Sequence, residues 1–242
     1  MMKRWAVFLV SVFMALSLAS CAVLPGGGSS QSEEKLEGQE IIENAMRRYN
    51  EQQNGGYEAY DNTADRLLER FVYCYDEVGF LIFLSEVYND DGSVYKEYNT
   101  GYAVYIEEDG KGVKLPKSDE RFIVYNSEVS KYTKTSDAVF GFIAEGVTSV
   151  DRADASDGSY IYTYVYDPDA AGVQVDGGKL ADYSIAYSVN SADEVYEFTQ
   201  KASGTFDSGD TFNYDYTIKL IPSDSVGIIE NPITVSETDV SG

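Results

Sequence analysis

Histidine is absent from the 242-residue chain, and cysteine occurs only twice. The lack of histidine excludes a Ser-His-Asp triad, a Cys-His nucleophile pair and a zinc site ligated by histidine. Two cysteines are too few for a zinc site made of cysteines alone or for a disulfide-rich scaffold. We therefore expect a non-enzymatic protein with no catalytic residue, no metal site and no cofactor.

Basic residues are also scarce, because 18 Lys and Arg face 41 Asp and Glu, for a formal net charge of −23. Nucleic-acid binding depends on Lys and Arg at the phosphates, so no nucleic-acid partner is expected. The Asp-Gly turns do not match a calcium-binding EF-hand loop: aligning Gly92, Gly110 or Gly158 with its glycine leaves a non-acidic residue at the first ligand position. A hydrolase that uses two carboxylates stays open, although no pair stands out.

The N-terminal region is typical of an export signal. Two basic residues precede the run Trp5–Leu18, whose 14 residues are mostly apolar. A membrane-spanning helix needs about 20 such residues, whereas this length suits a signal peptide. The run ends in Leu18-Ala19-Ser20-Cys21, which resembles the lipobox of bacterial lipoproteins. The resemblance implies that residues 1–20 are removed and that the Cys21 thiol carries a diacylglycerol in a fatty-acylated (palmitate-bearing) lipoprotein.

The lipobox resemblance also implies a location, on the outer face of the cell membrane. Two acyl chains are enough for stable anchoring, so the diacylglycerol on Cys21 would be the membrane contact. Residues 21–32 contain the run Pro25-Gly26-Gly27-Gly28-Ser29-Ser30 and are predicted to form a flexible tether. A single α+β sheet domain is expected over residues 33–235, followed by a frayed tail at 236–242.

Two helices are predicted. Ile42, Ala45, Met46 and Tyr49 recur at helical spacing, and Asn54-Gly55-Gly56 is expected to end that helix. A second, short helix is predicted at residues 137–145, with Ser at its start and Gly after its end.

The remainder alternates apolar and polar residues, as half-buried strands do. Strands are predicted at 71–75, 80–88, 93–98, 102–107, 159–166, 183–189, 195–199 and 211–220. Cys74 falls within the first of these and is expected to be an inert core thiol. Together these elements predict an α+β fold: a large, mostly antiparallel sheet with an N-terminal helix and a short mid-chain helix packed on one face.

The order of these elements, with the closing Ile228-Ile229-Glu230-Asn231-Pro232, resembles exported lipoproteins of the LolA/LppX type and is similar to lipoproteins of Gram-positive bacteria whose ligand is unknown. The LolA/LppX resemblance implies that the sheet is curved into an open half-barrel whose concave face holds lipid acyl chains. The apolar sheet face also exceeds what two short helices can cover. We therefore expect a carrier for a lipid or other hydrophobic ligand, lined by Ile185, Tyr187, Phe198, Phe212, Tyr214 and Tyr216.

Tyrosine is abundant, with 21 residues against 11 Phe, and this supports an alternative. Tyrosine favours strands and packs well between them, which explains the abundance structurally. It also supplies rigid contact area, so a Tyr-rich face with an acidic surface could instead belong to a module that contacts an unknown protein or a glycan, although the structural explanation is favoured. The best candidate for such a surface is the alternating set Tyr160, Tyr162, Tyr164 and Tyr166.

Overall fold

The computed structural model of the chain describes residues 35–108, 110–122 and 140–235. The export signal, Cys21, the tether and the tail at 236–242 lie outside these ranges, so what was predicted for them stays a prediction. None of the helices in the described ranges combines the length and the hydropathy that a membrane crossing requires.

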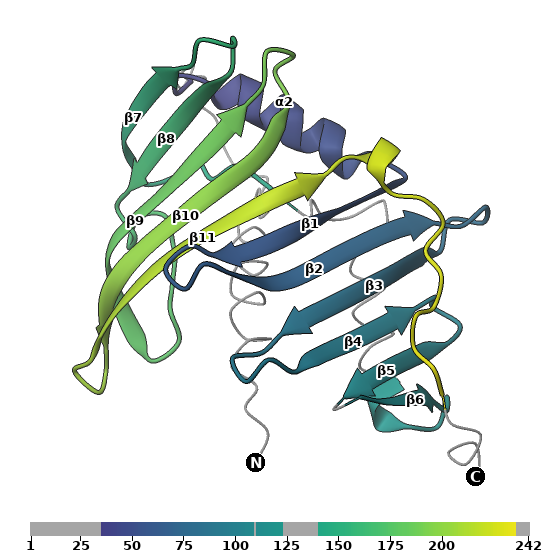
Figure 1. Cartoon of the computed structure of the whole chain (residues 1–242). Coiled ribbons are helices and arrows are strands. Elements are labelled where there is room, and N and C mark those ends of the chain that lie inside the picture. The colour runs from purple at the N-terminus through teal and green to yellow at the C-terminus, as the bar shows by residue number, and fades with distance from the viewer. Residues whose placement is uncertain (1–34, 109, 123–139, 236–242) are drawn as a thin grey trace, which may run out of the picture. The chain divides into compact units, whose positions relative to one another are not determined.

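Eleven strands form one open sheet, in the order β6-β5-β4-β3-β2-β1-β11-β10-β9-β8-β7 (Figure 1). Neighbouring strands from β1 to β6 and from β7 to β10 pair antiparallel. The predicted α+β class, with a large antiparallel sheet, is confirmed. The strands are β1 (Asn54–Asp61), β2 (Arg66–Tyr75), β3 (Leu81–Tyr88), β4 (Val94–Asn99), β5 (Val104–Glu108), β6 (Lys111–Leu115), β7 (Val147–Asp154), β8 (Tyr160–Tyr166), β9 (Gly178–Val189), β10 (Val195–Phe206) and β11 (Thr211–Ile221).

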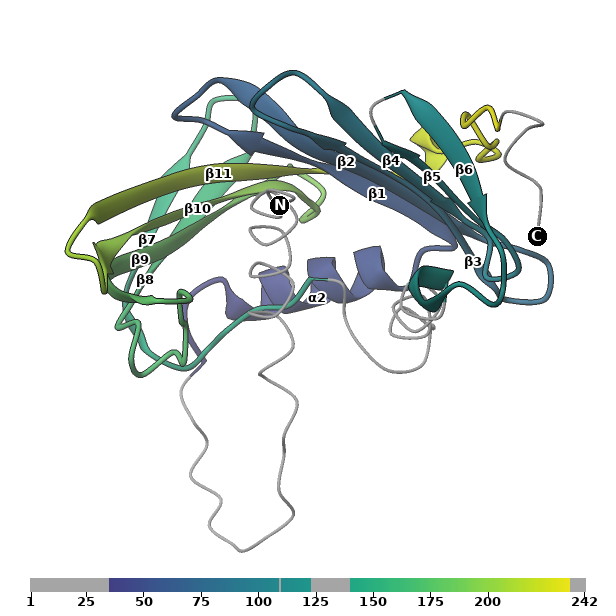
Figure 2. The same cartoon turned by 90° about the horizontal axis from the view of Figure 1, so that it is seen from below.

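Helix α2 (Gln39–Asn50) is the predicted N-terminal helix, and its buried residues are the predicted stripe. Its first turn is acidic and its last turn basic, with Arg47 and Arg48 near the partly negative C-terminal end of the helix dipole. The Gln39 side chain accepts a hydrogen bond from the Leu36 N–H at 3.1 Å, which helps to satisfy the entry to the helix. Figure 2 shows α2 as a separate layer from strands β8, β9 and β10 of the same part of the chain.

The described residues group into two compact units. The first takes its residues from 51–108, 110–122 and 218–235, and contains β1 to β6 with the single 3-10 turn η3 (Ser223–Ser225). The second takes its residues from 35–50 and 140–217, and contains α2 with β7 to β10 and most of β11. The prediction of one domain over residues 33–235 stays a prediction.

In the first unit, the C-terminal segment packs on one face of the sheet. Ile233 joins Val72, Leu84 and Tyr98 in a buried apolar cluster. Gly112 then forms a parallel bridge to Val235, and a Cβ at Gly112 would lie only 2.2 Å from the carbonyl oxygen of Thr234. Glycine is therefore required where this segment crosses β6.

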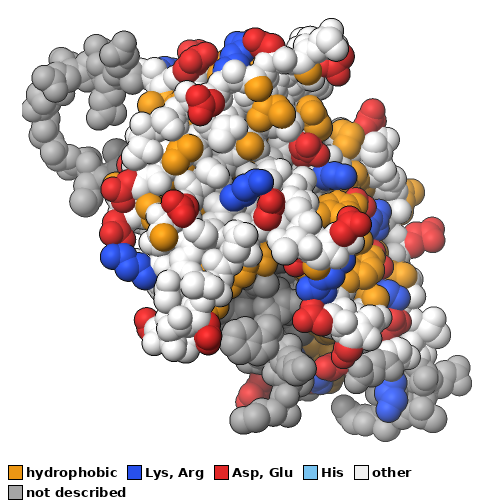
Figure 3. Space-filling view, turned by 60° about the vertical axis from the view of Figure 1, so that its left-hand side comes forward, with side chains coloured by type: hydrophobic (Ala, Val, Ile, Leu, Met, Phe, Trp, Pro, Cys, Tyr) orange, Lys and Arg blue, Asp and Glu red, His pale blue; other side chains and the backbone are white. Residues whose placement is uncertain are grey.

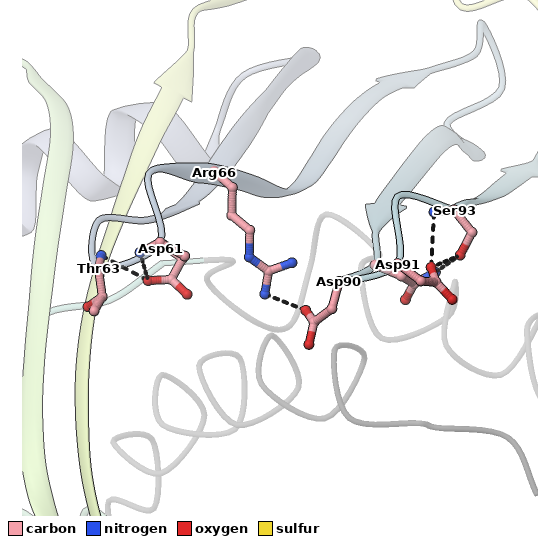
Figure 4. A network of polar contacts seen from close by, with 8 residues as sticks. Asp61, Thr63, Arg66, Asp90, Asp91 and Ser93 are labelled. Carbon is pink, nitrogen blue, oxygen red and sulfur yellow. Dashed lines mark hydrogen bonds and ion pairs between the residues drawn. The ribbon is translucent and has the colours of Figure 1, made fainter.

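Short polar turns fix the hairpins of the first unit (Figure 4). The Asp61 carboxylate accepts hydrogen bonds from the N–H groups of the next turn, including that of Thr63 at 2.9 Å. The Asp91 carboxylate accepts from Ser93 in the same way at 3.0 Å. Such Asx turns replace backbone pairing at the bend. An ion pair of 2.6 Å between Arg66 and Asp90 connects the start of β2 to the β3–β4 turn.

Several expectations about individual elements were wrong. Of the helix predicted at 137–145, residues 140–144 form neither helix nor strand, and residues 137–139 lie outside the described ranges. Helical structure instead occurs at 120–122. Strands β1, β6 and β7 were not predicted, and β9 and β10 are longer than predicted. Strand β1 begins at Asn54, three intervening residues after α2 ends at Asn50, where the sequence indicated only a helix stop.

Candidate functional site

The predicted ligand lining and the predicted contact surface lie on the same face of the second unit. In β8 and β9, Tyr162 lies opposite Tyr187, and Tyr187 in turn lies opposite Phe198 of β10. Since side chains alternate along a strand, the even-numbered tyrosines of β8 share this face with Tyr183, Ile185 and Tyr187. The two sets that the sequence offered as alternatives are therefore one surface.

Strand β11 continues the same face. On the opposite face, Thr199 hydrogen-bonds to Thr217 at 2.8 Å and Lys201 pairs with Asp215 at 3.0 Å. A Cβ at Gly204 would lie 2.5 Å from the ring of Phe212. A single antiparallel register satisfies all three contacts. This register places Phe212, Tyr214 and Tyr216, the predicted lining residues of β11, on the same face as the tyrosines of β8. This surface, here called the aromatic face, consists of Tyr160, Tyr162, Tyr164, Tyr166, Tyr183, Ile185, Tyr187, Phe198, Phe212, Tyr214 and Tyr216.

The same register places a small side chain between two large ones. Ala202 lies opposite Tyr183 of β9 in the printed pairing, and the β10–β11 contacts put Tyr214 on its other side. Gln200, two residues before Ala202, lies opposite Ile185 and next to Tyr216. Gln200, Ala202 and Tyr214 are half-buried, whereas Tyr183 and Tyr216 are buried. We call Gln200, Ala202 and Tyr214 the open end of the aromatic face.

Helix α2 and the chain leading into it cover the other end of the aromatic face. The Tyr164 hydroxyl donates a hydrogen bond of 2.6 Å to the carbonyl oxygen of Glu37. Gly38 has φ +74°, and a Cβ there would lie 2.6 Å from the ring of Tyr162. At the end of the helix, the carbonyl of Asp193 accepts from Arg48 while its carboxylate accepts from the hydroxyl of Tyr160.

The segment 140–143, which is neither helix nor strand, also packs on the aromatic face. The ring of Phe140 lies between those of Tyr49 and Phe198, at centroid distances of 5.9 and 5.3 Å. The ring of Phe142 lies 4.9 Å from Tyr164 and contacts Tyr187 as well. Both rings thus reach side chains of the sheet from positions two residues apart. A helix would separate them by about 200°.

The four tyrosines of β8 are buried, at 7%, 2%, 0% and 3% exposure in chain order. A contact surface made of Tyr160, Tyr162, Tyr164 and Tyr166 needs exposed rings, so the structure does not present that surface. The cause is the cover just described: the hydroxyl groups of Tyr164 and Tyr166 already bond to the carbonyl groups of Glu37 and Ile143.

The aromatic face is electrically neutral over most of its area. Burial raises the pKa of Tyr166, Tyr183 and Tyr187 well above the usual value of 10, so these phenols stay protonated at physiological pH. A guanidinium is found at the edge strand β7, where Arg152 lies 4.5 Å over the ring of Tyr160 and donates to the hydroxyl of Tyr162 at 3.0 Å. Arg152 is itself paired with Asp154 at 2.7 Å.

Acidic side chains are absent from the residues that form the aromatic face. Figure 3 shows them scattered among apolar and uncharged side chains on one side of the molecule. In the described ranges, no group of three or more Asp, Glu or Cys side chains is arranged to hold a metal ion. The arrangement suits the binding of apolar groups against rings, with hydrogen bonds from neutral side chains.

Cys74, expected to be an inert core thiol, is half-buried. Burial raises the pKa of this thiol, against a hydrogen bond involving the backbone of Ile229. A thiol with a raised pKa forms little thiolate and is a poor nucleophile.

Sequence reasoning missed Tyr183 and two residues of the open end. Tyr183 was assigned to a strand but not to the lining, and Gln200 and Ala202 were placed beyond the end of their predicted strand. The available signal was the spacing Phe198, Gln200, Ala202, which continues the period of two past the apolar residues.

Comparisons with known proteins show little at the sequence level: no family model matches the chain, and no curated protein sequence matches it. Among solved structures, the chain is similar to LprF from Mycobacterium bovis. The TM-score is 0.42 at 12% identity, and the match covers 82% of this chain and 98% of that one.

Proposed function

We propose that the protein is an exported, membrane-anchored lipoprotein that binds a lipid or another hydrophobic ligand without catalysing a reaction. The observation that carries the proposal is the aromatic face, whose apolar side chains continue from the part covered by α2 into the open end. A protein that needed this face only as its own core would gain from covering Gln200, Ala202 and Tyr214 too, because buried apolar area stabilises folding.

The anchor is proposed from the sequence alone. A lipidated Cys21 would hold the domain at the membrane through residues 21–32, within reach of lipids but outside the hydrocarbon layer. Metabolic labelling with tritiated palmitate tests this step: the wild-type chain should carry label and fractionate with membranes, and Cys21→Ser should carry none. A labelled Cys21→Ser variant would exclude Cys21 as the lipidation site.

Ligand binding is tested by blocking the open end. Ala202→Phe adds a ring between Tyr183 and Tyr214, and we expect it to reduce uptake of a fluorescent, uncharged acyl ester at least tenfold. Ala186→Phe is the matched control, since Ala186 is also half-buried but lies opposite Thr199 on the other face of the sheet. Equal uptake by the two variants, or no uptake by the wild type, would contradict the proposal.

A further inference from the structure

Two buried polar atoms on the aromatic face have no hydrogen-bond partner among the described residues. They are the hydroxyl oxygen of Tyr183 and the side-chain oxygen Oε1 of Gln200. Tyr183 is only 2% exposed. Leaving a polar group buried and unpaired is costly, so native proteins pair nearly all of them. Two such atoms on one apolar surface therefore call for a partner that the described chain does not supply.

The two atoms belong to neighbouring side chains. Tyr183 lies directly opposite Ala202, and Gln200 is two residues from Ala202 on the same face of β10. Diagonal neighbours in an antiparallel pair are about 7 Å apart, which is within reach of a tyrosine and a glutamine side chain. Ala202, whose side chain is only a methyl group, lies next to both of them. One group inserted above Ala202 could therefore contact both polar side chains.

The surroundings of this position are uncharged. The neighbours on the same face are Ile185, Tyr214 and Tyr216, and burial keeps the Tyr183 phenol neutral. The nearby charges of Lys201 and Asp215 lie on the opposite face and neutralise each other at 3.0 Å. A carboxylate or ammonium group placed above Ala202 would be desolvated without a counter-ion, which is far more costly than burying a hydroxyl or carbonyl group.

We infer that the position above Ala202 is a subsite for an uncharged polar group of the ligand, hydrogen-bonded by the Tyr183 hydroxyl and the Gln200 amide. The ligand class is thus a neutral amphiphile that carries a hydroxyl, ester or amide group next to its hydrocarbon chain. The hydroxyl of Tyr183 and the amide of Gln200 can each donate and accept, so the subsite suits both a hydroxyl and a carbonyl group. This inference rests on the proposed binding of hydrophobic ligands and specifies which of them bind.

The test compares three radiolabelled probes of similar chain length: 1-monooleoylglycerol, oleic acid and octadecane. Binding to the full chain held in amphipol is measured by spin-column filtration, with amphipol alone subtracted. We expect the acylglycerol to bind at least tenfold more tightly than ionised oleic acid at pH 8. We expect Tyr183→Phe and Gln200→Leu each to weaken acylglycerol binding about five- to tenfold and to leave octadecane binding unchanged, as the loss of one neutral hydrogen bond predicts.

A second readout does not depend on any ligand. Removing an unpaired buried hydroxyl should leave the melting temperature of Tyr183→Phe equal to or above that of the wild type. Ser203→Ala is the control, because it removes a hydroxyl that does have a partner: the Ser203 hydroxyl donates to Asp182 at 2.7 Å. A clear fall in the melting temperature of Tyr183→Phe would mean that the hydroxyl already has an internal partner, and would overturn the inference.

The outcomes separate this inference from the proposed function. Octadecane binding without a preference for the acylglycerol would overturn the subsite while supporting a hydrophobic binding site. If Tyr183→Phe and Gln200→Leu weakened the binding of all three probes equally, the two side chains would only shape the face. That result would also overturn the subsite. A failure of all three probes to bind would contradict the proposed function, and the subsite with it.

Discussion

Asn50 and Phe140 exchange two hydrogen bonds. The Asn50 side-chain amide donates to the Phe140 carbonyl oxygen at 2.7 Å, and the Phe140 N–H donates to Asn50 Oδ1 at 3.3 Å. An asparagine side chain thus imitates one residue of a neighbouring strand and holds the segment 140–143 against the last turn of α2. This pair joins two parts of the cover over the aromatic face.

The Asn50 pair predicts a loss of stability when it is removed. We expect Asn50→Ala to lower the free energy of unfolding by about 1–3 kcal/mol, because it removes two part-buried hydrogen bonds to the backbone of Phe140. Asn44→Ala is the matched control on the same helix, where the exposed amide only accepts from Arg47 at 3.0 Å and the expected loss is below about 0.5 kcal/mol. Urea unfolding measures both; equal losses would show that the Phe140 pairing is unimportant.

Gly38 is predicted to be intolerant of a side chain. Gly38→Ala places a Cβ 2.6 Å from the Tyr162 ring at a φ of +74°, so clash and backbone strain add. We expect a loss of roughly 2–4 kcal/mol. Gly79→Ala isolates the backbone contribution, because Gly79 has φ +89° and nothing within 4 Å, and its loss should be about 1–2 kcal/mol. Thermal unfolding should rank the two variants in this order, and the reverse order would contradict the packing of Gly38 on Tyr162.

Glu69 gives the first unit a dependence on pH. Its side chain is 5% exposed, and Ser85 donates to Oε1 at 3.1 Å. Burial raises its pKa from 4.5 to about 7, against the opposing hydroxyl groups of Ser85 and Tyr57. A carboxyl group with a raised pKa favours the folded state while it is protonated. Its contribution is therefore fully present below pH 4.5 and falls as the pH rises from 4.5 to about 7.

The Glu69→Gln variant tests that sign. Glutamine keeps an acceptor for Ser85 without the charge, so the variant should be more stable than the wild type by about 3 kcal/mol at pH 8. The difference should shrink as the pH falls and nearly vanish near pH 4.5. Urea titrations of both proteins between pH 4.5 and 8 measure it. A difference that is constant with pH would show that Glu69 titrates normally.

Arg152 is predicted to stabilise edge strand β7 through its stacking on tyrosine rings. Its guanidinium lies 4.5 Å from the Tyr160 centroid and 5.4 Å from that of Tyr162. We expect Arg152→Ala to cost about 1–2 kcal/mol, from the lost cation–π contacts and the hydrogen bond to Tyr162. Asp154→Asn removes only the exposed ion pair and should cost under about 0.5 kcal/mol. Hydrogen exchange of β7 amides reports both, and equal protection in the two variants would contradict the role of stacking.

The sequence predicted best the elements whose periodicity comes from burial on one side. The stripe of α2 and the alternation of β11 were assigned to the right residues, since each has one covered and one wet face. The same logic failed for β7, an edge strand whose eight residues are exposed or half-buried, so that no apolar alternation marks it. The same logic also failed for β1, because its first residues include glycines, which read as a helix stop. Gly56 is needed there because a Cβ would lie 2.2 Å from the Phe71 carbonyl oxygen.

The candidate site was predicted in part. The alternation of β8, β9 and β11 found residues that share one face, but it could not show that the tyrosines of β8 join them, because that depends on strand pairing between distant segments. The helix predicted at 137–145 failed for a related reason: Phe140 and Phe142 were fitted to a helical pattern, and their real spacing is set by rings on Tyr49, Tyr164 and Phe198. Tertiary contacts overrode the local preference.

The most direct measurement is mass spectrometry of an organic extract from the purified full chain, compared with its Ala202→Phe variant. The proposed function predicts a non-covalent lipid or other apolar compound that co-purifies with the wild type and is depleted at least tenfold in the variant. An extract that contains only the covalent anchor, together with no uptake of a fluorescent, uncharged acyl ester by the wild type, would contradict it.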